Sequence, residues 1–415
     1  MFRWLTSDGK VIFLSMALRS FGYIAIGIAF PIYLTLIGYD VTIIGLLVTS
    51  GFLSGATFTA FSSFFADRIG RKRSLLLFSS LSIISGIILT FSRNIILLFI
   101  ASVLGSIGTS GAAGAFSPIE HAIITQSCSS EYRTKAFSYY YLFGSIAGSL
   151  GSLFGGFPDL MVNYYNMNRL MAFQILFLIF SGLSLIVFIA YLMLSKKCEL
   201  NLVNRLDKTK IVKISSETKS FVLKLSILFS VDSFAGGFLS QSMVSYWFYA
   251  RFNIELASIS QIFFLSKIFV TISFLIAPYI ARKIGLLNTQ VFTHLPSSIM
   301  LSILPLAPDL NFALALYLGR QLLSEMDVPT RQSYIMAIVK PEERTFASGV
   351  TSLVRVFSAS ISPSIAGYIM KIYSLSAPLG IGGILKTAYD ISLYLTFRNI
   401  KPPEEIKDKK VSVAE

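Results

Sequence analysis

Long apolar runs separated by short polar stretches alternate along nearly the whole chain. Each run spans about 18–30 residues, which at 1.5 Å per residue is enough to cross a hydrocarbon core of about 30 Å. Twelve runs can be delimited, at residues 11–37, 41–65, 75–92, 95–124, 136–157, 167–194, 221–249, 256–280, 289–306, 310–338, 346–373 and 378–397. The pattern therefore predicts an all-α integral membrane protein with twelve transmembrane helices.

Composition and charge agree with that prediction. Only 13% of the residues are charged, about half of what a soluble domain carries, and mean hydropathy is +0.70. The net charge of +14 is distributed unevenly, because the termini and every second loop hold 24 Lys and Arg residues and the other loops hold three. By the positive-inside rule both termini lie in the cytoplasm. The basic balance thus reflects topology in a cell (plasma) membrane and not a nucleic-acid surface.

Neither a removable leader nor a cofactor is expected. The first apolar run carries Arg19 and has no small-residue cleavage site, so it is interpreted as a retained helix. Cys128 and Cys198 are too far apart in sequence to form a motif, and they imply no disulfide or metal framework.

A short, strongly basic loop between the second and third runs carries the clearest motif. It reads Asp67-Arg68-Ile69-Gly70-Arg71-Lys72 and resembles the signature between helices two and three of the major facilitator superfamily. The family's leading glycine, four residues before the acid, is Ser63 here. The resemblance implies two pseudo-symmetric six-helix bundles, which we place at 1–194 and 221–397, with a cytoplasmic linker at 195–220 and a cytoplasmic tail at 398–415.

An internal repeat supports two related halves. A shift of 211 residues pairs Pro118, Glu131, Arg133, Thr134 and Ala136 with identical residues at positions 329, 342, 344, 345 and 347. A shift of 213 aligns residues 19–21 with 232–234, and a shift of 215 aligns residues 66–70 with 281–285. Two such halves can rock about a midplane site and expose it to each side in turn.

The repeated cytoplasmic loops are the expected gate. Its predicted residues are Asp67, Arg68, Gly70, Arg71, Arg133, Glu342 and Arg344. Asp67 is expected to cap a neighbouring helix N-terminus or to pair with Arg133. Alternatively, the arginines only anchor the topology and contact anionic lipid head groups.

The fifth run is rich in glycine, at Gly148, Gly151, Gly155 and Gly156. It resembles the G-P-x-x-G-G element of antiporters in this superfamily, with Ser152 in place of the proline. The resemblance favours export, and ordinary close packing of small residues is the alternative.

Charged side chains inside membrane spans are costly and usually face a cavity or a partner. In the superfamily, helices one, four, seven and ten line the central cavity. The predicted substrate and coupling residues are Arg19, Glu120, His121, Asp232, Arg320, Glu325, Asp327 and Arg331, with Arg355 from helix eleven and Gln241 if helix seven breaks at Gly236-Gly237.

Several pairings remain open for these charges. Arg19 and Asp232 hold equivalent positions in the two halves, and they either form a latch between the halves or find separate partners. Asp327 and Arg331 are four residues apart and can neutralise each other, as can Lys386 and Asp390.

We expect a secondary active transporter that works by alternating access, and proton-coupled export of amphipathic drugs or metabolites is the leading function. The alternatives are uptake or exchange of a small organic anion, and a non-transporting membrane receptor. The sequence has no Walker loop, HExxH or GxSxG motif, so no enzyme is expected. The expected partners are a small solute, protons and the bilayer, and a monomer is favoured.

Overall fold

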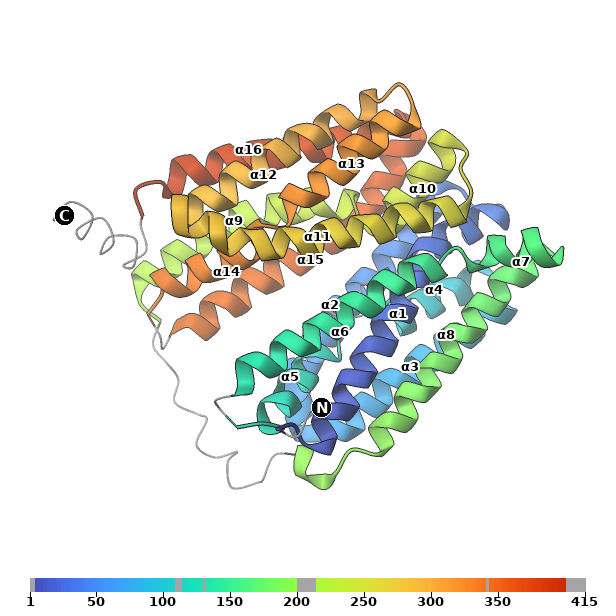
Figure 1. Ribbon diagram of the computed structural model, residues 1–415, viewed down its shortest axis with the longest axis horizontal. Helices are drawn as coiled ribbons and strands as arrows, with labels where there is room; N and C mark the ends of the chain where they lie inside the picture. Colours follow the sequence, from blue (N-terminus) through green and yellow to red (C-terminus); the bar gives the residue numbers. More distant parts are fainter. Residues whose placement is uncertain (1–3, 109–113, 130–131, 200–213, 341–342, 401–415) are drawn as a thin grey trace. The chain divides into compact units, whose positions relative to one another are not determined.

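The computed structural model describes residues 4–108, 114–129, 132–199, 214–340 and 343–400. Over these ranges all regular structure is helical (Figure 1). The α-helices are α1 Ser7–Leu36, α2 Val41–Ile69, α3 Arg71–Phe91, α4 Ile95–Gly105, α5 Ser117–Gln126, α6 Arg133–Phe154, α7 Phe157–Tyr165, α8 Arg169–Leu192, α9 Ser216–Phe238, α10 Gln241–Phe252, α11 Leu256–Ile284, α12 Leu286–Ile303, α13 Leu310–Ser324, α14 Asp327–Ile338, α15 Arg344–Ile372 and α16 Ala377–Phe397.

Seven helical segments of the described residues are long and apolar enough to cross a membrane. They are α1, α2, α3, α8, α11, the joined α9 and α10, and residues 346–372 of α15. The other five expected spans fall on α4 with α5, α6 with α7, α12, α13 with α14, and α16. The prediction of an all-α membrane protein is confirmed, and several spans are made of two consecutive helices.

The chain forms two compact units. Unit 1 comprises residues 1–209, 240–264 and 363–371, and unit 2 comprises residues 210–239, 265–362 and 372–415. The chain passes from one unit to the other between α9 and α10, within α11 and within α15.

Unit 1 is built around α1, which packs against α6, α8 and α10 (Figure 1). Most of α1 is buried, including the continuous stretch from Gly22 to Leu34. Toward the start of α1, Ile12 and Met16 join Ile123 of α5 and Tyr140 of α6 in one apolar core. A helix with apolar residues on all its faces is expected at the centre of such a bundle.

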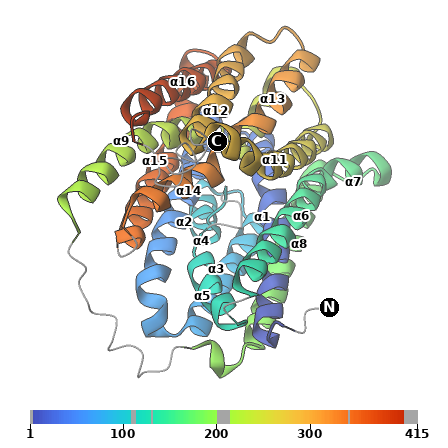
Figure 2. The same cartoon turned by 60° about the vertical axis from the view of Figure 1, so that its left-hand side comes forward.

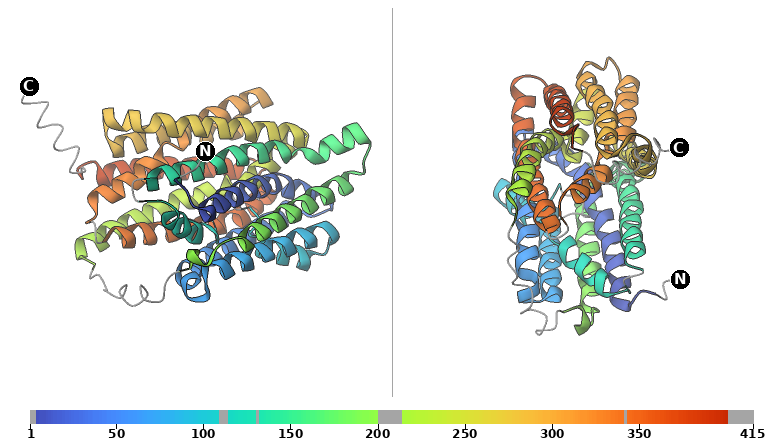
Figure 3. Two further views of the ribbon diagram at one scale, coloured as in Figure 1. Left: turned by 60° about the horizontal axis from the view of Figure 1, so that its bottom comes forward. Right: turned by 90° about the vertical axis from the view of Figure 1, so that its left-hand side faces the viewer.

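Unit 2 is organised around α16, which packs against α12 and α9 (Figure 2). Its apolar core brings together Phe229 of α9, Val291 of α12, Tyr334 of α14 and Leu393 of α16. In unit 1, α3 packs against α8 in the same way as α12 packs against α16, and the α3–α8 pair can be followed by colour in Figure 3. These two pairs occupy matching places in the sequence repeat.

The repeated glycine of the basic loop has the same geometry in both units. Gly70 has a φ of 111° and Gly285 a φ of 90°, a region that side chains disfavour. Each glycine N–H donates to the alanine carbonyl four residues earlier, over 2.9 Å. Each glycine carbonyl then accepts the first backbone bond of the next helix, from Ser74 in unit 1 and from Thr289 in unit 2, over 3.0 Å. Backbone geometry therefore explains why this glycine remains in the second copy.

The paired prolines of the repeat lie where two spans are interrupted. Pro118 lies in the first turn of α5, and Pro329 in the first turn of α14. Proline has no N–H to donate, so it fits the first turn of a helix and disfavours continuation from a preceding one. Each unit thus has one span divided into two shorter helices at the corresponding place.

The predicted glycines of α6 lie at close helix contacts within unit 1. A Cβ at Gly151 would clash with the backbone of Phe21 on α1, and one at Gly156 would come 2.7 Å from the Cα atom of Ala257 on α11. At Gly155 it would come within 3.1 Å of the Ser260 hydroxyl, and at Gly148 within 2.6 Å of the Ile24 side chain. Small residues allow this approach.

We predict that Gly151→Ala lowers the thermal stability of the purified protein, while Gly182→Ala on α8 does not. The methyl group at position 151 meets backbone, which cannot move aside cheaply, and such overpacking costs about 1–3 kcal/mol. A Cβ at Gly182 has nothing within 4 Å, so alanine there gains helix propensity of about 1 kcal/mol. Unfolding followed by intrinsic fluorescence in detergent measures both. Equal melting temperatures for the two variants would contradict the packing argument.

Candidate functional site

Each unit contains a cluster of buried charge, and the cluster of unit 1 is centred on Glu120. This α5 carboxylate forms an ion pair with Arg19 of α1, and both side chains are buried. The hydroxyl of Tyr140 donates to Oε2 of Glu120 over 2.6 Å, and that of Tyr191 donates to Oε1 over 2.7 Å. Arg19 also lies 4.1 Å from the centre of the Phe116 ring, a cation–π contact. The carboxylate is therefore well compensated, and it ties together α1, α5, α6 and α8.

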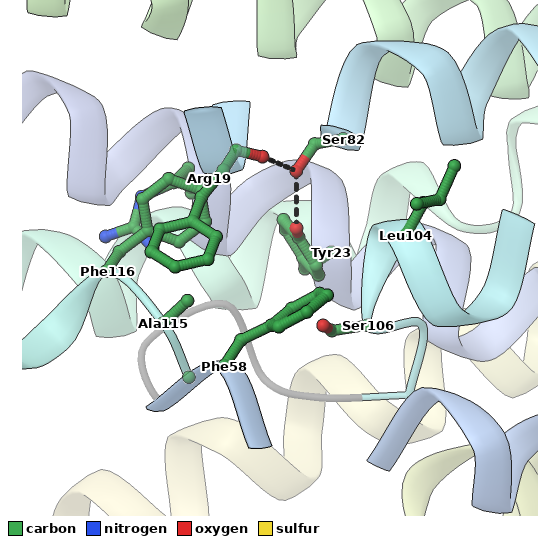
Figure 4. Close-up of a pocket in the computed structure, with 10 residues that line it drawn as sticks. Arg19, Tyr23, Phe58, Ser82, Leu104, Ser106, Ala115 and Phe116 are labelled. Carbon is green, nitrogen blue, oxygen red and sulfur yellow. Dashed lines mark hydrogen bonds between the residues drawn. The ribbon is translucent and has the colours of Figure 1, made fainter. Parts of the chain in front are cut away.

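A pocket lies beside this ion pair (Figure 4). Its lining combines the rings of Tyr23, Phe58, Phe78 and Phe116 with Arg19, and the Tyr23 hydroxyl is hydrogen-bonded to that of Ser82 over 2.9 Å. The lining is aromatic with a few polar groups, but the cavity volume is about 10 Å³, room for about one water molecule.

His121, next to Glu120 in sequence, is not part of the ion pair. Its Nε2 is 3.2 Å from the Tyr141 hydroxyl, and its ring packs against Phe137 and Tyr140 of α6. Adjacent residues of a helix point about 100° apart, so Glu120 and His121 have different surroundings.

The cluster of unit 2 is centred on Asp232 of α9. Lys386 of α16 donates to Oδ1 of Asp232 over 2.5 Å. Nε2 of His294, on α12, lies 3.9 Å from that oxygen, and Nη1 of Arg331, on α14, lies 3.9 Å from Oδ2. Arg331 is also ion-paired with Asp327. All five side chains are buried.

His294 links this cluster to a second carboxylate. Its Nδ1 is 2.7 Å from Oδ1 of Asp390 on α16, and the Ser298 hydroxyl donates to Oδ2 over 2.9 Å. With Nδ1–H donating to Asp390, the neutral imidazole has its free Nε2 directed toward Asp232. A carboxylate that accepts a hydrogen bond from one ring nitrogen in this way fixes the tautomer of the imidazole, and so leaves the other nitrogen unprotonated in the neutral ring.

The described pairings settle two expectations about span charges. Asp327 pairs with Arg331, as predicted. Lys386 and Asp390 form no direct ion pair, because α9 and α12 pack against α16 and present closer partners, Asp232 and His294.

Arg19 and Asp232 each have a partner in their own unit, Glu120 and Lys386.

Gln241 belongs to unit 1, where its side-chain amide donates to the Ile24 carbonyl over 3.3 Å. The interruption after Gly236-Gly237, where α9 ends and α10 begins, separates Gln241 from Asp232.

The remaining predicted cavity residues also lie in unit 2. Arg320 is buried on α13, and Glu325 is half-buried at the end of this helix. Arg355 of α15 is half-buried and donates from Nε to the Ser233 hydroxyl over 3.2 Å. Arg320 and Ser324 of α13 and Asp327 and Arg331 of α14 are all buried.

The basic loop of unit 1 is held by an acid that the sequence analysis missed. Glu199 accepts the backbone N–H groups of Arg71 over 2.7 Å and of Lys72 over 3.1 Å, at the N-terminus of α3. Asp67 pairs with Arg71, four residues later in the same loop, over 2.8 Å. The predicted pairing of Asp67 with Arg133 involves a side chain outside the described residues. Arg68 is exposed. The carboxylate of Glu199 compensates the positive end of the α3 dipole.

In unit 2, Glu343 plays the corresponding capping role. Its carboxylate accepts the Ser215 N–H over 2.5 Å and the Thr218 hydroxyl over 2.5 Å at the start of α9. Arg344 donates to the Val339 carbonyl over 3.3 Å. Of the predicted gate, Glu342 and the side chain of Arg133 lie outside the described residues.

The sequence analysis missed His294, the tyrosines around Glu120 and the role of Lys386 as partner of Asp232. His294 and Lys386 are ionisable residues inside apolar spans, so the rule that selected Asp232 could have found them. Tyr140 and Tyr191 carry no formal charge, so that rule gives no signal for them.

We predict that Glu120→Gln destabilises the protein and that adding Arg19→Met restores most of the loss. The single change leaves a buried guanidinium without its anion, which typically costs about 3–5 kcal/mol. The double variant removes the charge and keeps an amide, whose oxygen accepts from one of Tyr140 and Tyr191 while its NH2 group donates to the hydroxyl oxygen of the other. Melting temperatures in detergent test this, and a Glu120→Gln protein as stable as the unmodified one would contradict it.

We also predict that the start of α9 loosens in acid. Hydrogen bonds from Thr218 and then Ser215 lower the pKa of Glu343 below its ordinary 4.5. A depressed carboxyl pKa contributes stability that is fully present above the ordinary pKa and is lost as pH falls through the lowered value.

A spin label at position 216, in a chain whose two cysteines have been replaced, reports this transition as increased mobility. In Thr218→Val the transition moves to higher pH, because the largest of the lowering hydrogen bonds is gone. The account fails if the label's mobility is independent of pH.

Comparison with known proteins shows which family has this architecture. The sequence profile described as "Major Facilitator Superfamily" matches residues 12–324. A curated relative, "Uncharacterized membrane protein YJR124C" of Saccharomyces cerevisiae, is 24% identical over 429 residues, covering 96% of each chain.

Solved transporters share the fold. The nucleoside transporter NupG superposes with a TM-score of 0.72 at 14% identity, covering 94% of this chain and 99% of its own. A bacterial homolog of the human lysosomal transporter Spinster gives 0.67 at 16% identity, covering 95% and 96%. The protein is therefore a multi-pass membrane transporter and not an enzyme, and the chain belongs to the Major Facilitator Superfamily.

Proposed function

We propose that this transporter uses a proton gradient to export small amphipathic solutes across the plasma membrane, by alternating access and with both termini in the cytoplasm. The observation that carries the proposal is the buried Asp390–His294–Asp232 arrangement of unit 2. It places an imidazole, a group that can bind and release a proton, between two carboxylates inside the membrane spans.

The proposed coupling follows from the geometry around His294. A proton that arrives from one side binds the free Nε2 and makes the ring a cation facing Asp232, 3.9 Å away. Asp232 is then shared between this new cation, Lys386 and Arg331, so the existing ion pairs weaken. Proton uptake therefore changes the strength of the ion pairs that hold the helices together. Two arrangements of the helices with different ion pairs then bind the proton with different affinities, and this difference in affinity is what coupling requires.

The pocket of unit 1 supports an amphipathic solute. Arg19 lines the pocket and is compensated by its ion pair with Glu120, so the pocket has little net charge, and aromatic rings form much of its lining. Such a surface suits a molecule with a ring system and a polar group. The glycine packing of α6 against α1 and α11 agrees with the antiporter resemblance and supports export as the direction.

Uptake or exchange of an organic anion is the second candidate. One observation favours it: Arg320 is buried in unit 2, and no acidic side chain of the described residues is within ion-pair distance of it.

We predict that His294→Gln abolishes solute accumulation driven by a pH gradient and leaves exchange of labelled for unlabelled solute intact. Glutamine can still donate to Asp390 but cannot take up a proton. His121→Gln is the matched control, because the chain has only two histidines. Proteoliposomes with a panel of fluorescent amphipathic compounds, assayed with and without an imposed pH gradient, provide the measurement.

Gradient-driven accumulation that persists in His294→Gln would refute the coupling. Binding of panel compounds without any movement across the membrane would favour the receptor alternative.

A further inference from the structure

Arg320 differs from Arg19 and Arg331, which are also buried in the described spans, in forming no ion pair. Its side chain is 6% exposed, and its Nε has no hydrogen-bond partner. By contrast, Arg19 is paired with Glu120, and Arg331 with Asp327. Within the part of the chain that the structure describes, Arg320 is thus a buried cation without an ion pair.

The charges around Arg320 do not compensate it. Tyr317, Glu325 and Asp232 are the groups that act on it electrostatically, and none of them forms an ion pair with it. Asp232 is already ion-paired with Lys386, and the negative charge of Glu325 also attracts Lys267.

A charge count over unit 2 shows that its buried and half-buried cations outnumber its anions. The buried and half-buried charges of its described spans comprise five cations, Lys267, Arg320, Arg331, Arg355 and Lys386, and four anions, Asp232, Glu325, Asp327 and Asp390. With His294 neutral, one positive charge is in excess. Keeping an unpaired charge inside a membrane protein is costly, so a missing anion would be bound favourably.

The neighbours of Arg320 indicate what kind of anion fits. Tyr317, one turn earlier on α13, is buried and interacts with Gln321 and with Ser266 of α11. These residues offer an aromatic surface together with hydroxyl and amide groups. A guanidinium presents parallel N–H donors that match the oxygens of a carboxylate, sulfonate or phosphate.

We propose that Arg320 binds the anionic group of the transported solute, so that this transporter carries amphipathic organic anions. The inference rests on the proposed function, because it takes the compound bound at Arg320 to be the compound that is transported. Arg320 binds the charged group of this compound, whereas His294 and Asp232 form the separate site of proton coupling.

The experiment uses the full chain in detergent with matched pairs of small probes. Benzoate, phenylacetate, benzenesulfonate and phenyl phosphate are compared with benzamide, phenylacetamide and benzenesulfonamide, and the increase in melting temperature reports binding. We expect the anions to stabilise the unmodified protein and the neutral amides to do so much less. In Arg320→Met the anions bind about 10- to 100-fold more weakly, and Arg320→Lys retains part of the affinity.

A second readout separates binding from structure. Without any probe, Arg320→Met has a higher melting temperature than the unmodified protein, because an uncompensated charge has been removed. The matched variant Arg331→Met has a lower one, because it leaves Asp327 unpaired. A solute-free Arg320→Met protein that is less stable would show that Arg320 is a structural cation, and this would overturn the proposal.

Two further results would also overturn it: equal stabilisation by anions and amides, or an anion response that survives in Arg320→Met. Failure of the proton-coupling proposal can be distinguished from failure of the Arg320 proposal. In that case anion binding still depends on Arg320, while the pH gradient has no effect on transport.

Discussion

A charge held inside a membrane has to be compensated within a few ångströms, because no water is present to solvate it. For Glu120 and Asp232 the described structure meets this demand by bringing charges together from different helices, whereas Arg320 has no ion-pair partner among the described residues. Glu120 alone joins four helices of unit 1 through one arginine and two tyrosines. Asp232 has three basic groups within 4 Å in unit 2, each from another helix. Such clusters restrict how the helices can be arranged, because each shared charge holds several helices together.

Interrupted spans position these clusters. The prolines at 118 and 329 begin short helices, and these short helices carry Glu120 in unit 1 and Asp327 with Arg331 in unit 2. A break lets the second helix turn its polar face inward without requiring the whole span to be polar. Discontinuous helices of this kind commonly accompany binding sites in transporters, and here the sequence repeat accounts for their matched positions.

The all-α membrane architecture and the repeat could be predicted from the sequence, because apolar run length and the spacing of Pro118 and Pro329 are local signals. The partners of the charges were harder to predict. Lys386 lies four residues from Asp390, which indicated a pair on one helix, but tertiary packing provided Asp232 and His294 instead. Glu199 was missed because its role depends on a contact with α3, 128 residues earlier. Sequence spacing reports neighbours on one helix and gives no direct signal for those across helices.

The central claim is that His294 changes its protonation state within the folded protein. The most direct measurement is ¹⁵N NMR of the His121→Gln protein in lipid bilayers, in which His294 is the sole histidine. The account predicts that Nδ1 stays protonated while Nε2 gains a proton when the sample is acidified. A ring that keeps a single proton, on the same nitrogen, at every pH at which the protein stays folded would contradict it.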